Sequence, residues 1–156
     1  MSDPAYLREL KSWLRYNPRE VLAKGDGLFS ATTGNPTLPN WLGPIMVDLT
    51  VSAKSENDKY MKQLDSSSGV AVFVAAVDDH EHWTQVGRAC QRFALQATAL
   101  GLKTAFMNQP VEVAKFSPDL AALVGMPGHR PDIAMRFRYG PLTPYSARRP
   151  LAAVLI

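Results

Sequence analysis

The chain has 156 residues, of which 46% are hydrophobic and 20% are charged, and this balance excludes a wholly disordered protein. The formal net charge is +3, but the basic residues are scattered and form no basic stripe with interleaved aromatic residues, which argues against nucleic-acid binding. Cys90 is the one cysteine, so no disulfide forms within the chain, and no apolar run approaches membrane-spanning length. We therefore expect a cytoplasmic protein that binds neither membranes nor nucleic acid.

The N-terminal region carries two helix signals. Residues 4–15 place apolar side chains at helical spacing after Pro4, which predicts a first helix. Asn17 is a candidate N-cap, with Glu20 in the capping-box position three residues later, and Gly25 is a candidate C-cap. The sequence therefore predicts a short second helix between the two caps.

A segment rich in glycine and proline follows at residues 26–44, and it predicts a long irregular loop. Residues 45–65 are expected to be helical, with a break near Ser52-Ala53. The run Ser66-Ser67-Ser68-Gly69 has the composition of a turn.

The centre of the chain predicts a strand followed by a long helix. Val70 to Val77 is a continuous apolar run rich in β-branched residues, which is typical of a strand covered on both faces. Asp78-Asp79 is expected to cap a helix that continues to about Leu100. The residues predicted on its buried face recur at helical spacing and are Trp83, Val86, Gly87, Cys90, Phe93, Ala94, Ala97 and Leu100.

Extended and helical segments alternate after this helix. Gly101 is expected to end the helix, and Leu102 to Met107 is a predicted short strand. Val111 to Val124 is a predicted helix, interrupted at Ser117-Pro118, and Asp132 to Arg138 alternates as a strand does. This order predicts a single domain over the whole chain, of α/β or α+β class, with a central sheet flanked by helices.

Residues 91–110 contain the candidate binding element. A buried helix ends at Gly101, and the chain then runs extended to Asn108 and Gln109, two amides ahead of a proline. Many α/β proteins hold a flat cofactor with an element of this kind. The doublet Arg148-Arg149 adds planar guanidinium groups that suit a phosphate. The combination leads to a flavin hypothesis.

Each of these residues also has a structural interpretation. Arg148-Arg149 is either a phosphate clamp or two solvated arginines beside a proline. Asn108-Gln109 provides either flavin contacts or N-caps for the next helix. Phe106 and Met107 are either flavin contacts or ordinary core residues.

Short motifs occur in a characteristic order along the chain. They are Trp13-Leu14-Arg15, Asn17-Pro18-Arg19-Glu20, Gly25-Asp26-Gly27-Leu28, Trp83, Val86-Gly87-Arg88, Gln91 to Leu102, Asn108 to Glu112, Arg130-Pro131-Asp132 and Ser146 to Pro150. Together they resemble the C-terminal part of the flavin-dependent nitroreductase family, in its divergent Acg-like branch. The resemblance covers residues 5–155, almost the whole chain.

The resemblance implies an FMN-binding, nitroreductase-like α+β fold, in a homodimer with the flavin at the subunit interface. The residues it places along the isoalloxazine ring are Ala105, Phe106, Met107, Asn108 and Gln109. It places Arg148 or Arg149 at the ribityl phosphate. The implied activity is two-electron reduction of nitroaromatics or quinones, with NAD(P)H as hydride donor. Because the flavin carries out the hydride chemistry, no catalytic side chain is assigned.

The sequence departs from the family pattern in its first half. The family's Arg-Arg-Ser-like phosphate motif and the Gln-Pro-Trp-like segment after it are absent, so the chain corresponds to the C-terminal half of longer relatives. It is a fragment, a natural half-length homologue, or a half completed by a partner. The alternative function is therefore a non-enzymatic, flavin-sequestering or partner-dependent half-domain.

The cluster His80-Glu81-His82 has the composition of a metal site but not its spacing. Two histidines separated by one residue point to different sides of a helix, whereas a zinc-binding helix places them four residues apart. We therefore expect a solvated first helical turn here and assign no metal ligand.

Overall fold

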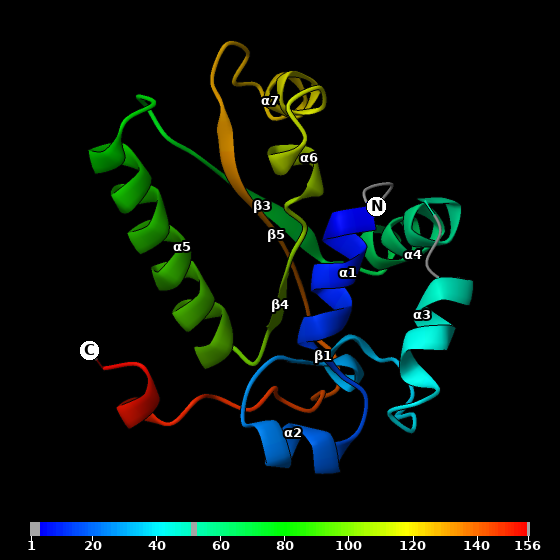
Figure 1. The fold of residues 1–156 in the computed structure, drawn as a ribbon. Helices are drawn as coiled ribbons and strands as arrows, with labels where there is room; N and C mark the ends of the chain where they lie inside the picture. Colours follow the sequence, from blue (N-terminus) through cyan, green and yellow to red (C-terminus); the bar gives the residue numbers. More distant parts are fainter. Residues whose placement is uncertain (1–3, 51–52, 156) are drawn as a thin grey trace. The chain divides into compact units, whose positions relative to one another are not determined.

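The computed structural model describes residues 4–50 and 53–155, and the chain forms two compact units (Figure 1). Unit 1 consists of Met1–Tyr60 together with Leu142–Ile156, and unit 2 consists of Met61–Pro141. Each unit has its own small sheet.

Unit 2 is built on an antiparallel sheet of strands β3 (Gly69–Val74), β4 (Lys103–Phe106) and β5 (Pro131–Arg138), in the order β3-β5-β4. Both outer strands pair with β5, so that Met135 lies opposite Ala71 on one side and opposite Phe106 on the other. Directly opposed residues of an antiparallel pair point to the same face of the sheet. Outside the irregularity between Phe73 and Val74, the register therefore assigns the strand residues to one of two faces.

Helix α5 (His80–Ala99) packs along one face of this sheet (Figure 1). Its N-cap is Asp79, whose side chain accepts a hydrogen bond from the His82 backbone N–H at 2.8 Å. Its C-terminal end is closed by Gly101 at φ +76°, with the Leu102 N–H donating to the Ala97 carbonyl at 2.9 Å. This is the Schellman arrangement that glycine favours at a helix end. Both predicted caps are confirmed.

The ring of Phe93 joins the helix to the sheet. It makes edge contacts with Phe73 at 5.7 Å and Phe137 at 5.5 Å between ring centroids, so these two strand residues lie on the α5 face. Val86, Cys90 and Ala97 are buried beside it, as the helical spacing predicts. The predicted buried face is too wide, however, because Trp83, Gly87 and Leu100 are exposed.

The prediction that Val70 to Val77 forms a strand covered on both faces is corrected by strand β3. The strand ends at Val74, and it lies at an edge of the sheet rather than in its centre. Val70 is 46% exposed, so the strand is not covered on both faces within the described chain. A continuous apolar run is typical of buried parallel strands, but here it forms an antiparallel edge.

Two short helices, α6 (Gln109–Glu112) and α7 (Ser117–Leu123), pack near the start of β5. Val111 and Ala121 are their buried residues. The helix predicted from Val111 to Val124 is thus interrupted as expected, but the interruption comes before Ser117, which begins α7.

Unit 1 begins with helix α1 (Pro4–Trp13), which is shorter than predicted. The next residues form strand β1 (Leu14–Arg15), which pairs in parallel with strand β2 (Leu28–Phe29). Between them lies helix α2 (Pro18–Lys24), with Gly25 at φ +62° as its C-cap. The predicted second helix is confirmed.

The segment predicted as irregular, residues 26–44, contains β2 and the 3-10 helix η1 (Ser30–Thr33). Helix α3 (Gly43–Thr50) begins inside its last residues. Helix α4 (Ala53–Asp65) follows, so residues 45–65 are helical as predicted, apart from residues 51–52, which lie outside the described residues. The break predicted near Ser52-Ala53 falls partly on them.

The C-terminal segment of unit 1 is extended and ends in the 3-10 helix η2 (Leu151–Ala153). The Ser146 hydroxyl accepts a hydrogen bond from the Phe29 backbone N–H at 3.0 Å, which fastens this segment to β2. The chain is therefore a mixed protein of α+β class. Among the described residues, no helix has the length and apolar character needed to cross a membrane.

Candidate functional site

The predicted flavin-contacting residues belong to two different units. Phe106, Met107, Asn108 and Gln109 lie in unit 2, where β4 meets α6, and Arg148-Arg149 lies in the C-terminal segment of unit 1.

Met107 and Asn108 fasten the end of β4 to β5. The Met107 N–H donates to the Ala134 carbonyl at 2.8 Å, and the Asn108 Oδ1 accepts from the Ala134 N–H at 3.0 Å. Met107 is only 8% exposed, which agrees with its interpretation as a core residue. Asn108 occupies the N-cap position of α6, but its side chain makes no capping hydrogen bond. Its Nδ2 has no partner among the described residues and keeps its two donors available.

Phe106 and Gln109 are the accessible members of this set. Phe106 is 61% exposed on edge strand β4, and Gln109 is exposed at the first position of α6. An exposed aromatic ring followed by amide groups offers a stacking surface and hydrogen-bond donors to a flat ligand.

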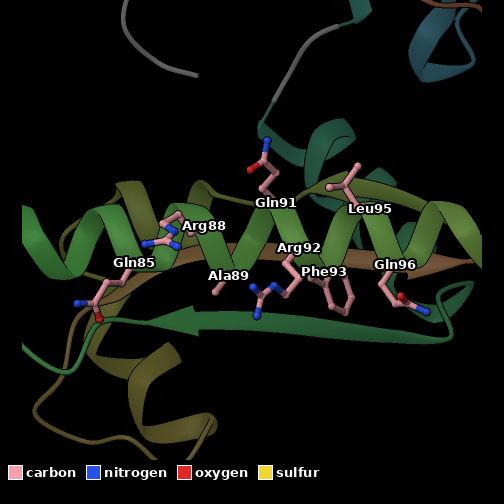
Figure 2. A pocket seen from close by; sticks show the side chains of 8 residues that line it. All are labelled: Gln85, Arg88, Ala89, Gln91, Arg92, Phe93, Leu95 and Gln96. Atoms are coloured by element: carbon pink, nitrogen blue, oxygen red, sulfur yellow. The ribbon is translucent and has the colours of Figure 1, made fainter.

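A shallow open groove of about 870 Å³ runs along α5 (Figure 2). Its lining comes entirely from that helix and consists of Gln85, Arg88, Ala89, Gln91, Arg92, Phe93, Leu95 and Gln96. Figure 2 shows Gln91 and Leu95 pointing to one side of the helix and Arg92 and Gln96 to the other. None of the six predicted cofactor-binding residues lines this groove.

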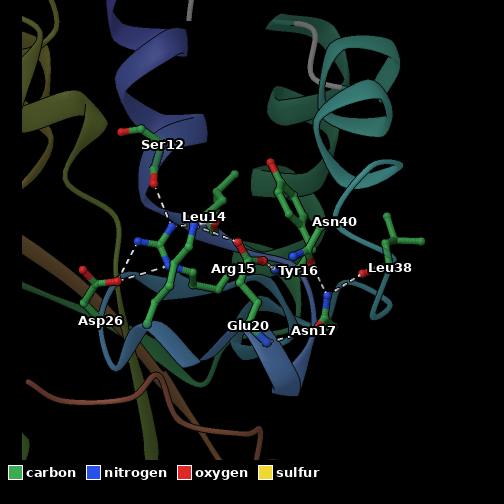
Figure 3. A network of polar contacts seen from close by, with 10 residues as sticks. Ser12, Leu14, Arg15, Tyr16, Asn17, Glu20, Asp26, Leu38 and Asn40 are labelled. Atoms are coloured by element: carbon green, nitrogen blue, oxygen red, sulfur yellow. Dashed lines mark hydrogen bonds and ion pairs between the residues drawn. The ribbon is translucent and has the colours of Figure 1, made fainter. Parts of the chain in front are cut away.

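A network around Arg15 organises unit 1 (Figure 3). The Arg15 guanidinium donates to Asp26 Oδ1 from Nη2 at 2.6 Å and from Nε at 3.2 Å. Its Nη1 donates to the carbonyls of Ser12 at 2.7 Å and Leu14 at 3.0 Å. Arg15 is buried, so these bonds compensate for the loss of its hydration. The hydrogen bond from Arg15 is the main cause that holds the pKa of Asp26 below its usual value.

A second part of the network holds the start of α2. The Asn17 side chain accepts the Glu20 N–H at 3.0 Å, while its Nδ2 donates to the Leu38 carbonyl at 3.2 Å and to Asn40. The Glu20 carboxylate returns to the Tyr16 N–H at 3.0 Å, one residue before the usual capping-box partner. The predicted cap is confirmed in this shifted form.

The basic doublet has two different environments. The Arg149 guanidinium lies over the Trp13 ring, 5.4 Å from its centroid, and its charge also helps to lower the pKa of Asp26. Arg148 is exposed and forms no ion pair with any described carboxylate. The sequence identified both arginines but not the role of Trp13.

Two buried hydroxyl groups of unit 1, Tyr16 OH and Ser30 Oγ, have no hydrogen-bond partner among the described residues. The Tyr16 ring lies against Gly43, where a side chain would overlap it. Burial is the main cause that raises the pKa of Tyr16. No motif in the sequence marked either hydroxyl, because burial of these positions depends on contacts between distant segments.

The histidine cluster forms the first turn of α5. His82 Nδ1 lies 2.7 Å from Asp79 Oδ1, so this ring belongs to the helix cap. The described residues contain no group of three histidine, cysteine or acidic side chains placed to hold a metal ion.

The sequence and the fold were compared with known proteins. No protein-family model matches the chain, and neither does any curated protein or solved structure.

Proposed function

We propose that this chain is an FMN-binding, nitroreductase-like protein that acts as an NAD(P)H-dependent oxidoreductase on nitroaromatics or quinones. The proposal includes a homodimeric, cytoplasmic protein with a nitroreductase-like fold. The observation that carries it is Arg148, an exposed arginine without a carboxylate partner among the described residues, next to the stacked Arg149.

The doublet has the properties that a phosphate requires. Ser146 anchors the preceding backbone to Phe29, and the Trp13 ring holds the Arg149 guanidinium, so less freedom is lost when a ligand binds. No described residue forms an ion pair with Arg148, and guanidinium–phosphate hydrogen bonds are among the strong, charge-assisted class. The ribityl phosphate of FMN fits this chemistry.

The β4–α6 junction has groups that suit the flavin ring. Exposed Phe106 offers an aromatic face, and the Nδ2 of Asn108 and the amide of Gln109 offer hydrogen bonds. Met107 is assigned to the core instead, because it is buried and bonded to β5. When bound, the flavin supplies the hydride chemistry, and the residues of this chain bind and orient it.

The rival function is flavin sequestration without turnover, in a half-domain that depends on a partner. This function is favoured by the hydrogen bond that Asn108 Oδ1 accepts from the Ala134 N–H. Because this oxygen is already engaged, it is not free to modify the electronic properties of the flavin ring. A protein of this kind binds FMN but oxidises no NADPH in the presence of a quinone. Aerobic and anaerobic NADPH oxidation by the FMN-loaded protein separates the two functions.

The binding proposal is tested with the double substitution Arg148→Ala and Arg149→Ala. We expect the FMN dissociation constant, measured by flavin fluorescence, to rise by roughly tenfold or more, because charge-assisted hydrogen bonds are lost. Riboflavin lacks the phosphate, so its affinity should not change. The control is Arg19→Ala, an exposed arginine in α2. Unchanged FMN affinity in the double variant would remove the phosphate clamp.

A further inference from the structure

Lys103, Arg136 and Arg138 occupy the face of the unit 2 sheet that is opposite α5. The register places Lys103 directly opposite Arg138, and Arg136 is two residues before Arg138 on the same strand. All three therefore point to one face. Phe137, the β5 residue between the two arginines, contacts Phe93 of α5. Because side chains alternate along a strand, the three cations lie on the face that α5 does not cover.

Among the described residues, these cations have no acidic partner. Arg138 donates from Nε to the Tyr139 carbonyl at 3.0 Å and from Nη1 to Ser66 Oγ at 2.9 Å, both neutral acceptors. Neither Lys103 nor Arg136 forms an ion pair with a described residue, and the Arg136 Nε is buried without a hydrogen-bond partner there.

The arrangement is energetically unfavourable without a counter-ion. Like charges directly opposite each other on a sheet destabilise it, and a buried guanidinium donor without an acceptor loses its hydration uncompensated. Burial and the neighbouring charge of Arg138 lower the pKa of Arg136, as expected for a cation in an unfavourable environment.

The strand neighbours of Arg136 on this face are small or exposed. Arg136 lies between Ala105 on β4 and Val70 on β3, and Val70 is 46% exposed. Arg136 itself is half-buried, with its Nε enclosed. The acidic residue nearest in β5, Asp132, is already engaged, since its Oδ2 accepts the Ala75 N–H at 2.7 Å.

We propose that this sheet face is an oxyanion site that binds a phosphate group through Arg136, Arg138 and Lys103. Guanidinium groups match the geometry of phosphate oxygens, and the lysine adds a point charge. The site is in unit 2 and is independent of the proposed flavin function, which uses Arg148-Arg149 of unit 1.

The test is calorimetric titration of the full chain with inorganic phosphate and, separately, with AMP, at an ionic strength held constant with sodium chloride. In the double Arg148→Ala and Arg149→Ala variant, which lacks the proposed flavin phosphate clamp, we expect saturable binding of one phosphate per chain. The informative variant is Arg136→Met, which keeps an apolar stem and removes the charge. Its phosphate affinity should fall by roughly tenfold or more, since a charge-assisted contact is lost. If Arg136→Met fails to fold, the loss of phosphate affinity is measured instead in Lys103→Met, which changes a residue at the end of an edge strand.

The matched control is Arg130→Met, because Arg130 already has a carboxylate neighbour, Asp78, at 3.4 Å. It should retain full phosphate affinity, as should the double Arg148 and Arg149 variant. Tighter binding of AMP than of phosphate would assign the site to a phosphate monoester, and equal binding would assign it to the free anion.

Three results would overturn the proposal. One is the absence of saturable phosphate and AMP binding, and another is equal affinity in the wild type and in Arg136→Met and Lys103→Met. The third is a dimer that dissociates in Arg136→Met while phosphate has no effect, which would mean that the cations face a second copy of the chain.

Discussion

Arg15, which is buried, and Asp26, which is partly exposed, form an ion pair. Two nitrogens of the guanidinium donate to the same carboxylate oxygen, at 2.6 and 3.2 Å. Arg15 belongs to β1, and Asp26 lies just before β2. The pair therefore joins the ends of the two segments that make the small parallel sheet of unit 1. Its charge state should control the stability of that unit.

The first prediction concerns the pH dependence of this pair. Because the folded pKa of Asp26 is lowered, its contribution to stability is present above the unfolded pKa, about 4, and is lost as the pH falls through the lower folded pKa. Asp26→Asn should be less stable than the wild type at pH 7 and should lose less stability on acidification. Urea unfolding at several pH values measures both effects.

The control for this prediction is Glu9→Gln, which changes an exposed carboxylate of α1. Its stability should follow the wild-type pH curve. If the free energies of unfolding of Asp26→Asn and the wild type changed with pH in parallel, the ionisation of Asp26 would not be coupled to folding.

The second prediction compares two glycines with positive φ in the same turn. Nothing lies near a Cβ added to Gly25, at φ +62°, whereas one added to Gly27, at φ +77°, would overlap the Trp13 carbonyl oxygen and lie 2.8 Å from Arg15 Cζ. Gly25→Ala should cost about 1–2 kcal/mol for the left-handed backbone. Gly27→Ala should cost a further ~1–3 kcal/mol for overlap. Equal losses in chemical denaturation would refute the close approach at Gly27.

The third prediction assigns a structural role to Asn108. Asn108→Ala leaves the N–H of buried Ala134 without an acceptor, which should lower the free energy of unfolding by about 1–3 kcal/mol. The neighbouring amide Gln109 is exposed, so Gln109→Ala should change stability by less than about 0.5 kcal/mol. Thermal and urea unfolding of the two variants measure the difference. Equal stability of both variants would contradict the bond to β5.

The fourth prediction concerns Cys90 on the buried side of α5. Burial raises the pKa of its thiol, so little thiolate is present and access is restricted. The native protein should react with a disulfide reagent more slowly than the protein in denaturant, by on the order of tenfold or more. Comparable rates in the two states would show that the helix leaves the sheet readily.

Local signals in the sequence predicted the helix ends that carry caps. Asn17, Asp79 and Gly101 each act through groups within a few residues, and all three occupy the predicted caps. The strands β4 and β5 also follow from local alternation and glycine placement, whereas the element order left the α/β and α+β classes open. Capping and turn chemistry depend on neighbours in the chain, so they can be recognised without a fold.

Features that depend on distant residues were not predicted. The pairing of Leu14–Arg15 with Leu28–Phe29 is too short to leave an alternating pattern, and burial of Arg15 requires Asp26, eleven positions later. The exposure of Val70 follows from the sheet order, which the run of apolar residues does not encode. No composition shift marked the division of the chain into two units.

The candidate site was predicted only in part, because some of its contacts also depend on residues that are distant in the sequence. Residue type identified Arg148 and Gln109, and both are accessible. The engagement of Asn108 Oδ1 and the burial of Met107 depend on the position of Ala134 in β5, which only the folded sheet defines. Whether those accessible groups serve a flavin stays a prediction.

The most direct test of the central proposal is the absorbance spectrum of the purified protein, before and after incubation with FMN and removal of free ligand. The account predicts flavin absorbance that corresponds to one FMN per chain, and FMN should be identified after release. A colourless protein that takes up no added FMN would contradict the proposed function.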